Sequence, residues 1–359
     1  MTYAFAAAGT GGHIYPALAV ARTLVKTGVD AGEIVFFGGD RLETRIVPEA
    51  GFELTQLDIR GLRRALTLDN LTIPMMVRRA ATEVADTLQT RPPGVLTVFG
   101  GYVSVPAALG ARRVGMPYVI HEQNAVPGVA NRYVARRARR TYVAFAPALG
   151  RFKGAELVGN PLAPAFERFD RSVMRGRALA RYGLDSHRPV VGIVGGSLGA
   201  QALNTATVSL AAAPERSFAI LHLTGADHYA AFAERSADSA HWVTEPFEQD
   251  MAMFYAASDI VLCRAGAMTV SELAATATPS IVVPLPAGKG YQALNAYDLQ
   301  RAGGAIIVDQ EHIATVPDRI ASLVRDPGRL AAMSDGARSV ARPEAAQRIA
   351  TALREIIDD

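Results

Sequence analysis

Short apolar segments typical of β-strands alternate with longer amphipathic segments along the whole chain, and this alternation constrains the fold most. The β-like segments cover residues 2–8, 34–38, 95–99, 118–121, 189–194, 219–224, 260–263, 280–283 and 305–308. Between them, residues 17–26, 200–210 and 250–258 carry apolar side chains at helical spacing. Strands that alternate with helices form βαβ units, so the sequence predicts an α/β protein with parallel sheets.

The chain of 359 residues is predicted to form two similar domains, because a strand, a glycine-rich turn and a helix start occur together twice. The two turns are Gly9–Gly12 and Gly195–Gly199. Between them, residues 159–164 contain two prolines, which disfavour helix and indicate a linker. A last helix, from about residue 344 to 357, is expected to pack back on the first half. The predicted domains are therefore residues 1–163 with 343–359, and residues 164–342.

Composition excludes several classes of protein. Charged or helix-breaking residues interrupt every apolar run before the roughly 18 residues that a membrane-spanning helix needs. No basic segment precedes the first apolar run, so we expect no export signal and a cytoplasmic location. The single cysteine, Cys263, excludes an intrachain disulfide and is expected to be a small buried side chain. The chain has no Cys/His cluster with metal-ligand spacing, no Walker A lysine and no nucleophile elbow.

The first glycine turn, which includes Thr10, Gly11 and Gly12, is followed at once by His13. Pro16 is expected in the first turn of the helix that follows. At the carboxyl end of a strand, His13 is a candidate general base, because the unperturbed pKa of histidine lies near physiological pH. The alternative is a histidine that only caps the helix.

Two turns of the second half are candidate anion sites, because glycines and small residues let the backbone of a helix N-terminus approach a phosphate. One carries Ser197, and the other carries Ala267, Met268 and Thr269. Glu272, about one turn further on, can accept hydrogen bonds from both hydroxyls of a ribose. The alternatives are a purely structural turn at Ser197 and a helix-end charge at Glu272.

Three further groups of polar residues are candidate ligand contacts. Gln292 and Asn295, at the start of a helix expected over residues 292–302, are predicted to present two amides on one face; a polar helix face is the alternative. The segments 100–104 and 121–124 follow apolar strands, at the sheet edge where open α/β proteins bind ligands. A hydrogen-bonded interdomain network is the alternative for residues 121–124.

Taken together, these motifs resemble the MurG family of glycosyltransferases. The matching blocks are GTGGHIYPALAVA from Gly9, IRGLRR from Ile59, FGGYVSVPA from Phe99, HEQNAVPG from His121, GNP from Gly159, GGSLGAQALN from Gly195 and CRAGAMTVSELAA from Cys263. The resemblance implies a GT-B architecture, with two Rossmann-like domains whose parallel sheets face a central cleft. It also implies an inverting hexosyltransferase that moves N-acetylglucosamine (GlcNAc) from UDP-GlcNAc to the C4 hydroxyl of N-acetylmuramic acid (MurNAc) in lipid I, giving lipid II in peptidoglycan synthesis.

The resemblance also implies roles for individual residues. His13 would be the base, Glu272 would bind the ribose, and Phe247 would lie near the uracil. The diphosphate would bind at Ser197 and residues 267–269, and the GlcNAc hydroxyls at Gln292 and Asn124. The remaining expected contacts are Thr10, Gly11, Gly12 and Asn295 for the donor, and Gly101, Tyr102, His121 and Glu122 for the acceptor. No cofactor and no obligatory metal are expected.

The stretch Leu71–Arg79 pairs an apolar segment with Arg78 and Arg79, and further arginines cluster at residues 60–64 and 136–140. Such patches can bind anionic lipid. With the resemblance, this predicts a peripheral protein on the cytoplasmic side of the cell membrane, with no nucleic-acid partner and with cell-wall synthesis proteins as candidate partners. A core helix with two surface arginines is the alternative.

The chain departs from the family pattern at Ala163, where arginine is frequent, at Leu198, where glutamine is usual, and at Gly290 and Tyr291. These departures concern donor affinity and sugar selectivity. The alternative functions are another GT-B transferase that acts on a glycolipid or natural product, a UDP-GlcNAc 2-epimerase, and a nucleotide-sugar sensor without turnover.

Overall fold

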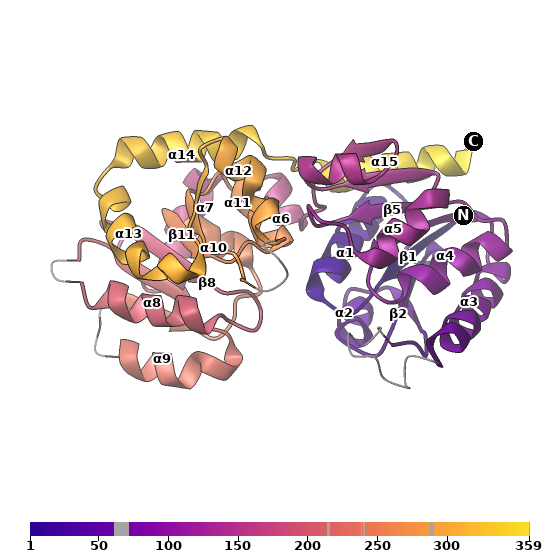
Figure 1. Cartoon of the computed structure of the whole chain (residues 1–359), viewed down its shortest axis with the longest axis horizontal. Helices are drawn as coiled ribbons and strands as arrows, with labels where there is room; N and C mark the ends of the chain where they lie inside the picture. The colour runs from indigo at the N-terminus through magenta and orange to yellow at the C-terminus, as the bar shows by residue number, and fades with distance from the viewer. Residues whose placement is uncertain (61–71, 214–215, 238, 240, 287–290, 359) are drawn as a thin grey trace. The chain divides into compact units, whose positions relative to one another are not determined.

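The computed structural model describes residues 1–60, 72–213, 216–237, 239, 241–286 and 291–358. The chain divides into two compact units (Figure 1). Met1–Ala163 and Pro343–Asp359 form the N-terminal unit, and Pro164–Arg342 form the C-terminal unit. Each unit is a parallel sheet with helices packed against it, so the predicted α/β class with parallel sheets is confirmed.

The sheet of the N-terminal unit has seven strands in the order β3-β2-β1-β4-β5-β6-β7, and all paired neighbours run parallel. The strands are β1 Thr2–Ala7, β2 Ile34–Gly38, β3 Glu53–Gln56, β4 Gly94–Gly100, β5 Tyr118–Glu122, β6 Arg140–Val143 and β7 Ala155–Leu157. The helices are α1 Gly11–Lys26, α2 Glu43–Glu49, α3 Ile73–Gln89, α4 Ser104–Arg113, α5 Val129–Val134 and α15 Ala345–Asp358.

The C-terminal unit has six parallel strands in the order β10-β9-β8-β11-β12-β13. They are β8 Val190–Val194, β9 Ala219–Leu223, β10 Trp242–Glu245, β11 Ile260–Cys263, β12 Ser280–Val282 and β13 Ala305–Ile307. Its helices are α6 Pro164–Glu167, α7 Arg171–Arg181, α8 Gln201–Ala211, α9 Tyr229–Ser236, α10 Met251–Ala257, α11 Ala267–Ala275, α12 Tyr297–Arg301, α13 Val316–Val324 and α14 Pro327–Ser339.

Both sheets have the strand order of the Rossmann fold, in which the direction of winding reverses beside the first strand. The reversal lies between β1 and β4 in the N-terminal unit and between β8 and β11 in the C-terminal unit. Open α/β sheets bind ligands at this switch point, beyond the carboxyl ends of the strands. The turns that carry Gly9, Gly101, Ser197 and Gly266 follow these four strands, so the topology places the predicted motifs at the ligand-binding edge of each sheet.

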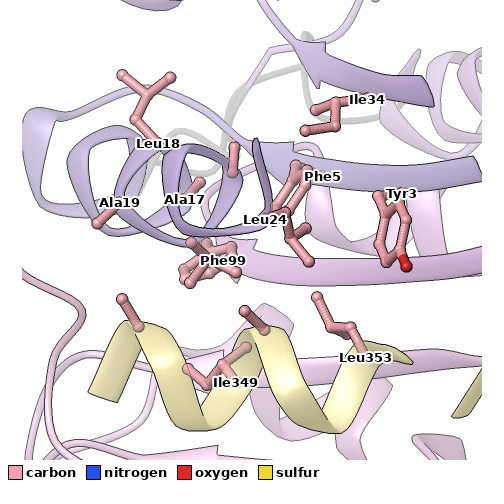
Figure 2. Close-up of a cluster of buried hydrophobic side chains, with 14 of the residues drawn as sticks. Tyr3, Phe5, Ala17, Leu18, Ala19, Leu24, Ile34, Phe99, Ile349 and Leu353 are labelled. Carbon is pink, nitrogen blue, oxygen red and sulfur yellow. The ribbon is translucent and has the colours of Figure 1, made fainter. Parts of the chain in front are cut away.

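Side chains of the N-terminal sheet alternate between two hydrophobic layers, as the two-residue period of a strand requires. Phe5 packs on one face, while its neighbours Ala4 and Ala6 pack on the other. The first layer also contains α1 and the terminal helix α15, whose Ile349 and Leu353 lie opposite Phe99 and Phe5 (Figure 2). The end of the chain therefore completes the core around β1 and β4.

Four strands have no counterpart among the predicted segments: β3, β6, β7 and β10. Three of them, β3, β7 and β10, are sheet-edge strands. β3 and β7 bury no side chain fully, and β10 buries only alternate side chains, so all three lack a continuous apolar run. The position predicted for Pro16 is wrong, because α1 begins at Gly11 and Pro16 lies inside the helix. The glycines start the helix earlier than the proline suggested, and Pro16 has no N–H for the carbonyl of Gly12. The helix predicted over residues 292–302 is a 3₁₀ turn, Ala293–Ala296, followed by α12.

Candidate functional site

The first glycine turn opens α1 without a side-chain cap. Thr10 precedes the helix in an extended conformation and makes no capping hydrogen bond to it. Gly9 has φ 92°, a conformation that favours glycine. The first N–H groups of a helix have no acceptor within the helix. The turn that includes Thr10, Gly11 and Gly12 therefore has the geometry of an anion site.

His13 is partly buried in the first turn of α1, and the main chain fixes its tautomer. Its Nδ1 lies 3.1 Å from the carbonyl oxygen of Ala8 and 3.3 Å from Oγ1 of Thr10. A carbonyl only accepts, so Nδ1 carries the proton and Nε2 carries the lone pair of the neutral ring. Burial lowers the pKa of His13, against smaller opposing effects of the Ala8 hydrogen bond, Glu122 and Glu43. A neutral ring with a free lone pair on Nε2 suits a general base.

Gly100, the last residue of β4, and Gly101, which follows it, make room for the residues around His13. A Cβ on Gly100 would lie 2.7 Å from Cδ2 of His13, and one on Gly101 would lie 2.5 Å from the carbonyl oxygen of Ala8. Both glycines have positive φ. Gly100 therefore lies against the imidazole, and Gly101 lies against Ala8, whose carbonyl is bonded to His13.

The polar segment that begins with the last two residues of β5, His121 and Glu122, forms a hydrogen-bonded network inside the N-terminal unit. Glu122 is buried, and its carboxylate accepts from the N–H groups of Asn124 (2.9 Å) and Gly128 (3.1 Å) and from Nδ2 of Asn131 (3.0 Å). His121 is also buried, and its Nε2 is bonded to the carbonyl of Gly159 at 2.8 Å. Burial lowers the pKa of His121 to about 4, against the opposing effect of the Gly159 hydrogen bond. These two side chains hold the loop, while Asn124 is partly exposed.

Glu43, a residue without a place in the sequence motifs, joins three loops of the same sheet edge. It is fully buried, and its carboxylate accepts hydrogen bonds from the main chain of Gly9 and Gly39 and from the hydroxyl of Tyr102. Tyr102 was expected on the acceptor side, and in the structure its hydroxyl is occupied by Glu43. The sequence offered no local signal for this contact, because the partners lie 34 and 59 residues from Glu43.

The second glycine turn is shaped by close backbone approach. A Cβ on Gly199 would lie 2.0 Å from the carbonyl oxygen of Thr224, and one on Gly195 would lie 2.4 Å from the N atom of Ala200. Helix α8 begins after Ala200, which makes no side-chain capping bond. Ser197 lies exposed in the turn before this helix. The position suits a contact between its hydroxyl and a bound anion.

Helix α11 begins in the same way after β11. Gly266 precedes it in an extended conformation without a side-chain cap, and residues 267–269 form its partly exposed first turn. Glu272 lies in the next turn, where its Oε2 accepts a 2.8 Å hydrogen bond from the hydroxyl of buried Tyr255. Among the described residues, no hydrogen bond to its Oε1 is formed. Burial raises the pKa of Glu272 to about 7, and the Tyr255 bond opposes that rise.

The two amides predicted to form one sugar-binding face are each bonded to main chain. Nδ2 of Asn295 donates to the carbonyl of Ala265 at 3.0 Å, and the Asn295 side chain is buried. Oε1 of Gln292 accepts from the N–H of Leu285 at 2.6 Å, and this residue is partly exposed. Asn295 therefore braces the loop before α11, and Gln292 is the more accessible of the two.

Phe247 extends from the loop between β10 and α10 and is 52% exposed. The next residue, Glu248, is buried and anchors this loop to α7, because it accepts from Arg181 at 2.8 Å and from the hydroxyl of Tyr182 at 2.5 Å. An exposed aromatic ring on an anchored loop suits the stacking of a planar base.

The predicted burial of Cys263 is confirmed.

Some sequence features give no site in the structure. Residues 61–64 of the IRGLRR block, Leu71 and Gly290 lie outside the described residues. Within the described part of the chain, Asp309, Glu311 and His312 are the one group with metal-ligand spacing, and all three are exposed. No described helix is long and apolar enough to cross a membrane.

Comparison with known proteins shows which family the chain is similar to. Residues 3–143 match the glycosyltransferase family 28 N-terminal domain, and residues 190–349 match the family 28 C-terminal domain. The chain is 42% identical to the UDP-N-acetylglucosamine–N-acetylmuramyl-(pentapeptide) pyrophosphoryl-undecaprenol N-acetylglucosamine transferase of Acidothermus cellulolyticus, over 98% of this chain and 96% of that protein. It is 40% identical to the same-named protein of Mycobacterium sp. strain KMS, over 96% and 93% of the two chains.

Solved structures agree with the sequence comparison. The crystal structure of Acinetobacter baumannii MurG matches with a TM-score of 0.79 and 30% identity, covering 99% of this chain and 100% of that one. A UDP-GlcNAc 2-epimerase from Neisseria meningitidis matches with a TM-score of 0.69 over 99% and 100% of the two chains, but at 12% identity it shows the GT-B type of fold alone. By its two domains and its near full-length similarity, the chain belongs to the MurG family of glycosyltransferases.

Proposed function

We propose that the protein transfers GlcNAc from UDP-GlcNAc to the C4 hydroxyl of MurNAc in lipid I, the undecaprenyl-pyrophosphoryl-MurNAc-pentapeptide. The product would be lipid II, an intermediate of peptidoglycan synthesis. The names of the 40–42% identical relatives support the substrates. The observation that carries the chemistry is the orientation of His13, whose Nδ1 is bonded to the carbonyl of Ala8 and whose Nε2 is left as the base.

The reaction is a single displacement. The C4 hydroxyl oxygen attacks C1 of GlcNAc, the bond between C1 and the diphosphate oxygen breaks, and UDP leaves with inversion at C1. The hydroxyl proton passes to Nε2 of His13. The N–H groups at the start of α11 and the Ser197 hydroxyl would stabilise the negative charge that develops on the diphosphate. This chemistry needs no cofactor, and we propose that no metal is obligatory.

The C-terminal unit would bind the donor. Oε1 of Glu272 is available to accept from the ribose hydroxyls, because Tyr255 occupies Oε2. Phe247 would stack on the uracil, and Gln292 with Asn124 would contact the GlcNAc hydroxyls. In the N-terminal unit, Thr10, Gly11 and Gly12 would contact the donor, and the loop around Gly101 would line the place of the acceptor.

We also propose that α3 seats the protein on an anionic membrane surface. At its start Met75 is 55% exposed, and Arg78 and Arg79 are exposed on the next turn. Its later residues, such as Val84 and Leu88, are buried in the core. A double Arg78→Glu, Arg79→Glu variant should bind vesicles rich in anionic lipid less than the unaltered protein does. Equal flotation of the two proteins with such vesicles would exclude this role.

Turnover with a defined acceptor tests the proposed function. The protein is given UDP-GlcNAc with a short-chain lipid I analogue, and UDP and the disaccharide product are measured. The proposal predicts UDP release that requires the acceptor and yields a β-1,4-linked disaccharide. Release of free sugar without acceptor would favour a 2-epimerase, and nucleotide binding without any turnover would favour a sensor.

A further inference from the structure

Glu43 is the first residue of α2, and the fold makes space for its side chain at the switch point of the N-terminal sheet. The residue has 0% exposure. Gly38, the last residue of β2, allows the approach, because a Cβ there would lie 2.8 Å from Cγ of Glu43. A buried carboxylate is costly unless it is fully hydrogen-bonded, so its partners define its role.

The Glu43 carboxylate connects the loops after β1, β2 and β4. Oε1 accepts from the N–H of Gly39 at 2.8 Å and from the hydroxyl of Tyr102 at 3.0 Å. Oε2 accepts from the N–H of Gly9 at 3.2 Å. All three partners donate, so one side chain satisfies donors from three segments that are distant in sequence.

The ring of Tyr102 locks the same three loops together by packing. A Cβ on Gly39 would lie 2.0 Å from its hydroxyl oxygen, and a Cβ on Gly9 would lie 3.3 Å from its Cε1. Burial and the neighbouring Glu43 raise the pKa of Tyr102, so the hydroxyl keeps its proton and remains a donor. The guanidinium of Arg41 lies 5.9 Å from the ring centroid and covers it.

Gly9 stands between the two groups that orient His13. The carbonyl of Ala8 precedes it and Oγ1 of Thr10 follows it, and both contact Nδ1 of His13. A displacement of Gly9 would therefore move both anchors of the imidazole. We propose that Glu43 is a positioning residue, which clamps the Gly9 turn and so fixes the direction of His13 Nε2. This inference rests on the proposed function for the role of His13 as base.

The charge of Glu43 gives the clamp a second effect. Glu43 from α2 and Glu122 from β5 both raise the pKa of His13, against the lowering by burial. Tyr102 faces Glu43, and Asp40 and Arg41 interact with Tyr102. Removal of the Glu43 charge should therefore lower the pKa of His13 further and weaken it as a base.

The test compares Glu43→Gln with Glu49→Gln, a control on the same helix whose side chain is exposed and pairs with Arg45 at 3.9 Å. A glutamine amide presents one acceptor and one donor, so Gly9 or the Gly39–Tyr102 pair would face an N–H group. We expect kcat of Glu43→Gln to fall about 10- to 100-fold. The affinity for UDP, which the C-terminal unit would bind, should stay unchanged by calorimetry. The acidic limb of the kcat profile should move to lower pH.

A titration without substrates separates this inference from the proposed function. The His13 imidazole is followed by NMR, with its signal assigned by its loss in His13→Ala. Glu43→Gln should lower the His13 pKa, whereas Glu49→Gln should leave it unchanged. If the unaltered protein shows no acceptor-dependent turnover, the proposed function fails, while this titration still decides whether Glu43 acts on His13.

Two further variants test the clamp if Glu43→Gln does not fold. Tyr102→Phe removes one bond but keeps the charge, so kcat should fall while the His13 pKa stays in place. Gly39→Ala should displace the Tyr102 hydroxyl and also lower kcat. Wild-type kcat in Tyr102→Phe and Gly39→Ala, or a Glu43→Gln protein with unchanged kcat and unchanged His13 titration, would overturn the inference.

Discussion

At the scale of single residues, the chemistry depends on an imidazole whose two nitrogens have different surroundings. Nδ1 of His13 is fixed by Ala8 and Thr10, and Nε2 carries the lone pair. General-base catalysis by such a group contributes about 10²- to 10⁴-fold to a rate. We predict that His13→Ala lowers kcat by an amount in this range and leaves the Kd for UDP-GlcNAc unchanged. Turnover equal to that of the unaltered protein would reject His13 as the base.

Glu272 should make donor binding depend on pH. Its pKa of about 7 means that it is largely protonated at pH 6 and ionised at pH 8. Only the ionised form accepts from both ribose hydroxyls, so the affinity for UDP-GlcNAc should rise with pH through about 7. Glu272→Gln should bind roughly 10- to 100-fold more weakly at pH 8, and its affinity should not change with pH. Calorimetry at several pH values checks both; a flat profile for the unaltered protein would contradict the assignment.

Tyr255→Phe refines this prediction. The hydrogen bond from Tyr255 lowers the pKa of Glu272, so its loss should raise that pKa and shift the midpoint of donor binding to higher pH.

The candidate donor residues were predictable because Ser197 and Glu272 lie in turns with local sequence signatures. Glu43 and Tyr255 were not, because their roles come from contacts between segments that only the folded sheet edge brings together.

At the scale of elements, the central strands of each sheet were predictable from sequence because they are continuous apolar runs buried on both faces. The structure agrees within two residues for β1, β2, β8 and β11. The edge strands β3, β7 and β10 were missed, because their exposed and buried side chains are mixed and form no continuous apolar run. The start of α1 was misplaced for a related reason, since Pro16 is tolerated inside the helix by an environment that the local pattern does not contain.

The end of α11 offers a test of a single backbone position. Ala277, just after the helix, has φ 50°, the left-handed conformation in which glycine normally ends helices. An alanine there is strained by roughly 1 kcal/mol, although glycine also gains freedom in the unfolded chain. Ala277→Gly should therefore raise the free energy of unfolding by up to about 1 kcal/mol, measured by denaturant titration. A clear loss of stability would mean that the left-handed conformation is not strained.

At the scale of the whole molecule, each unit contains a buried histidine that should make the fold sensitive to acid. Burial lowers the pKa of His121 to about 4 and that of His222 to about 3. Below about pH 6.5 these histidines are protonated in the unfolded chain but stay neutral in the folded protein. The free energy of unfolding is therefore highest above that pH and falls as the pH is lowered toward 4. His13, whose pKa is also lowered, adds to the fall.

Glu272 acts in the opposite direction, because its raised pKa favours the folded state at low pH and its contribution is lost as the pH rises through about 7. Three histidines against one carboxyl group give a net loss of stability between pH 7 and 5. Denaturant unfolding at several pH values checks this, and the slope should be steeper in Glu272→Gln. Stability that is constant or rising from pH 7 to 5 would contradict the buried, neutral state of these histidines.

The two units share one strand order and present glycine turns at equivalent edges, and we assign the nucleotide to one unit and the base to the other. A crystal structure with UDP-GlcNAc tests this division of roles directly. We predict that the diphosphate contacts the main chain of Met268 and Thr269 and the hydroxyl of Ser197, and that the ribose contacts Glu272. A uridine diphosphate bound anywhere other than beside Ser197 and Glu272 would contradict the account.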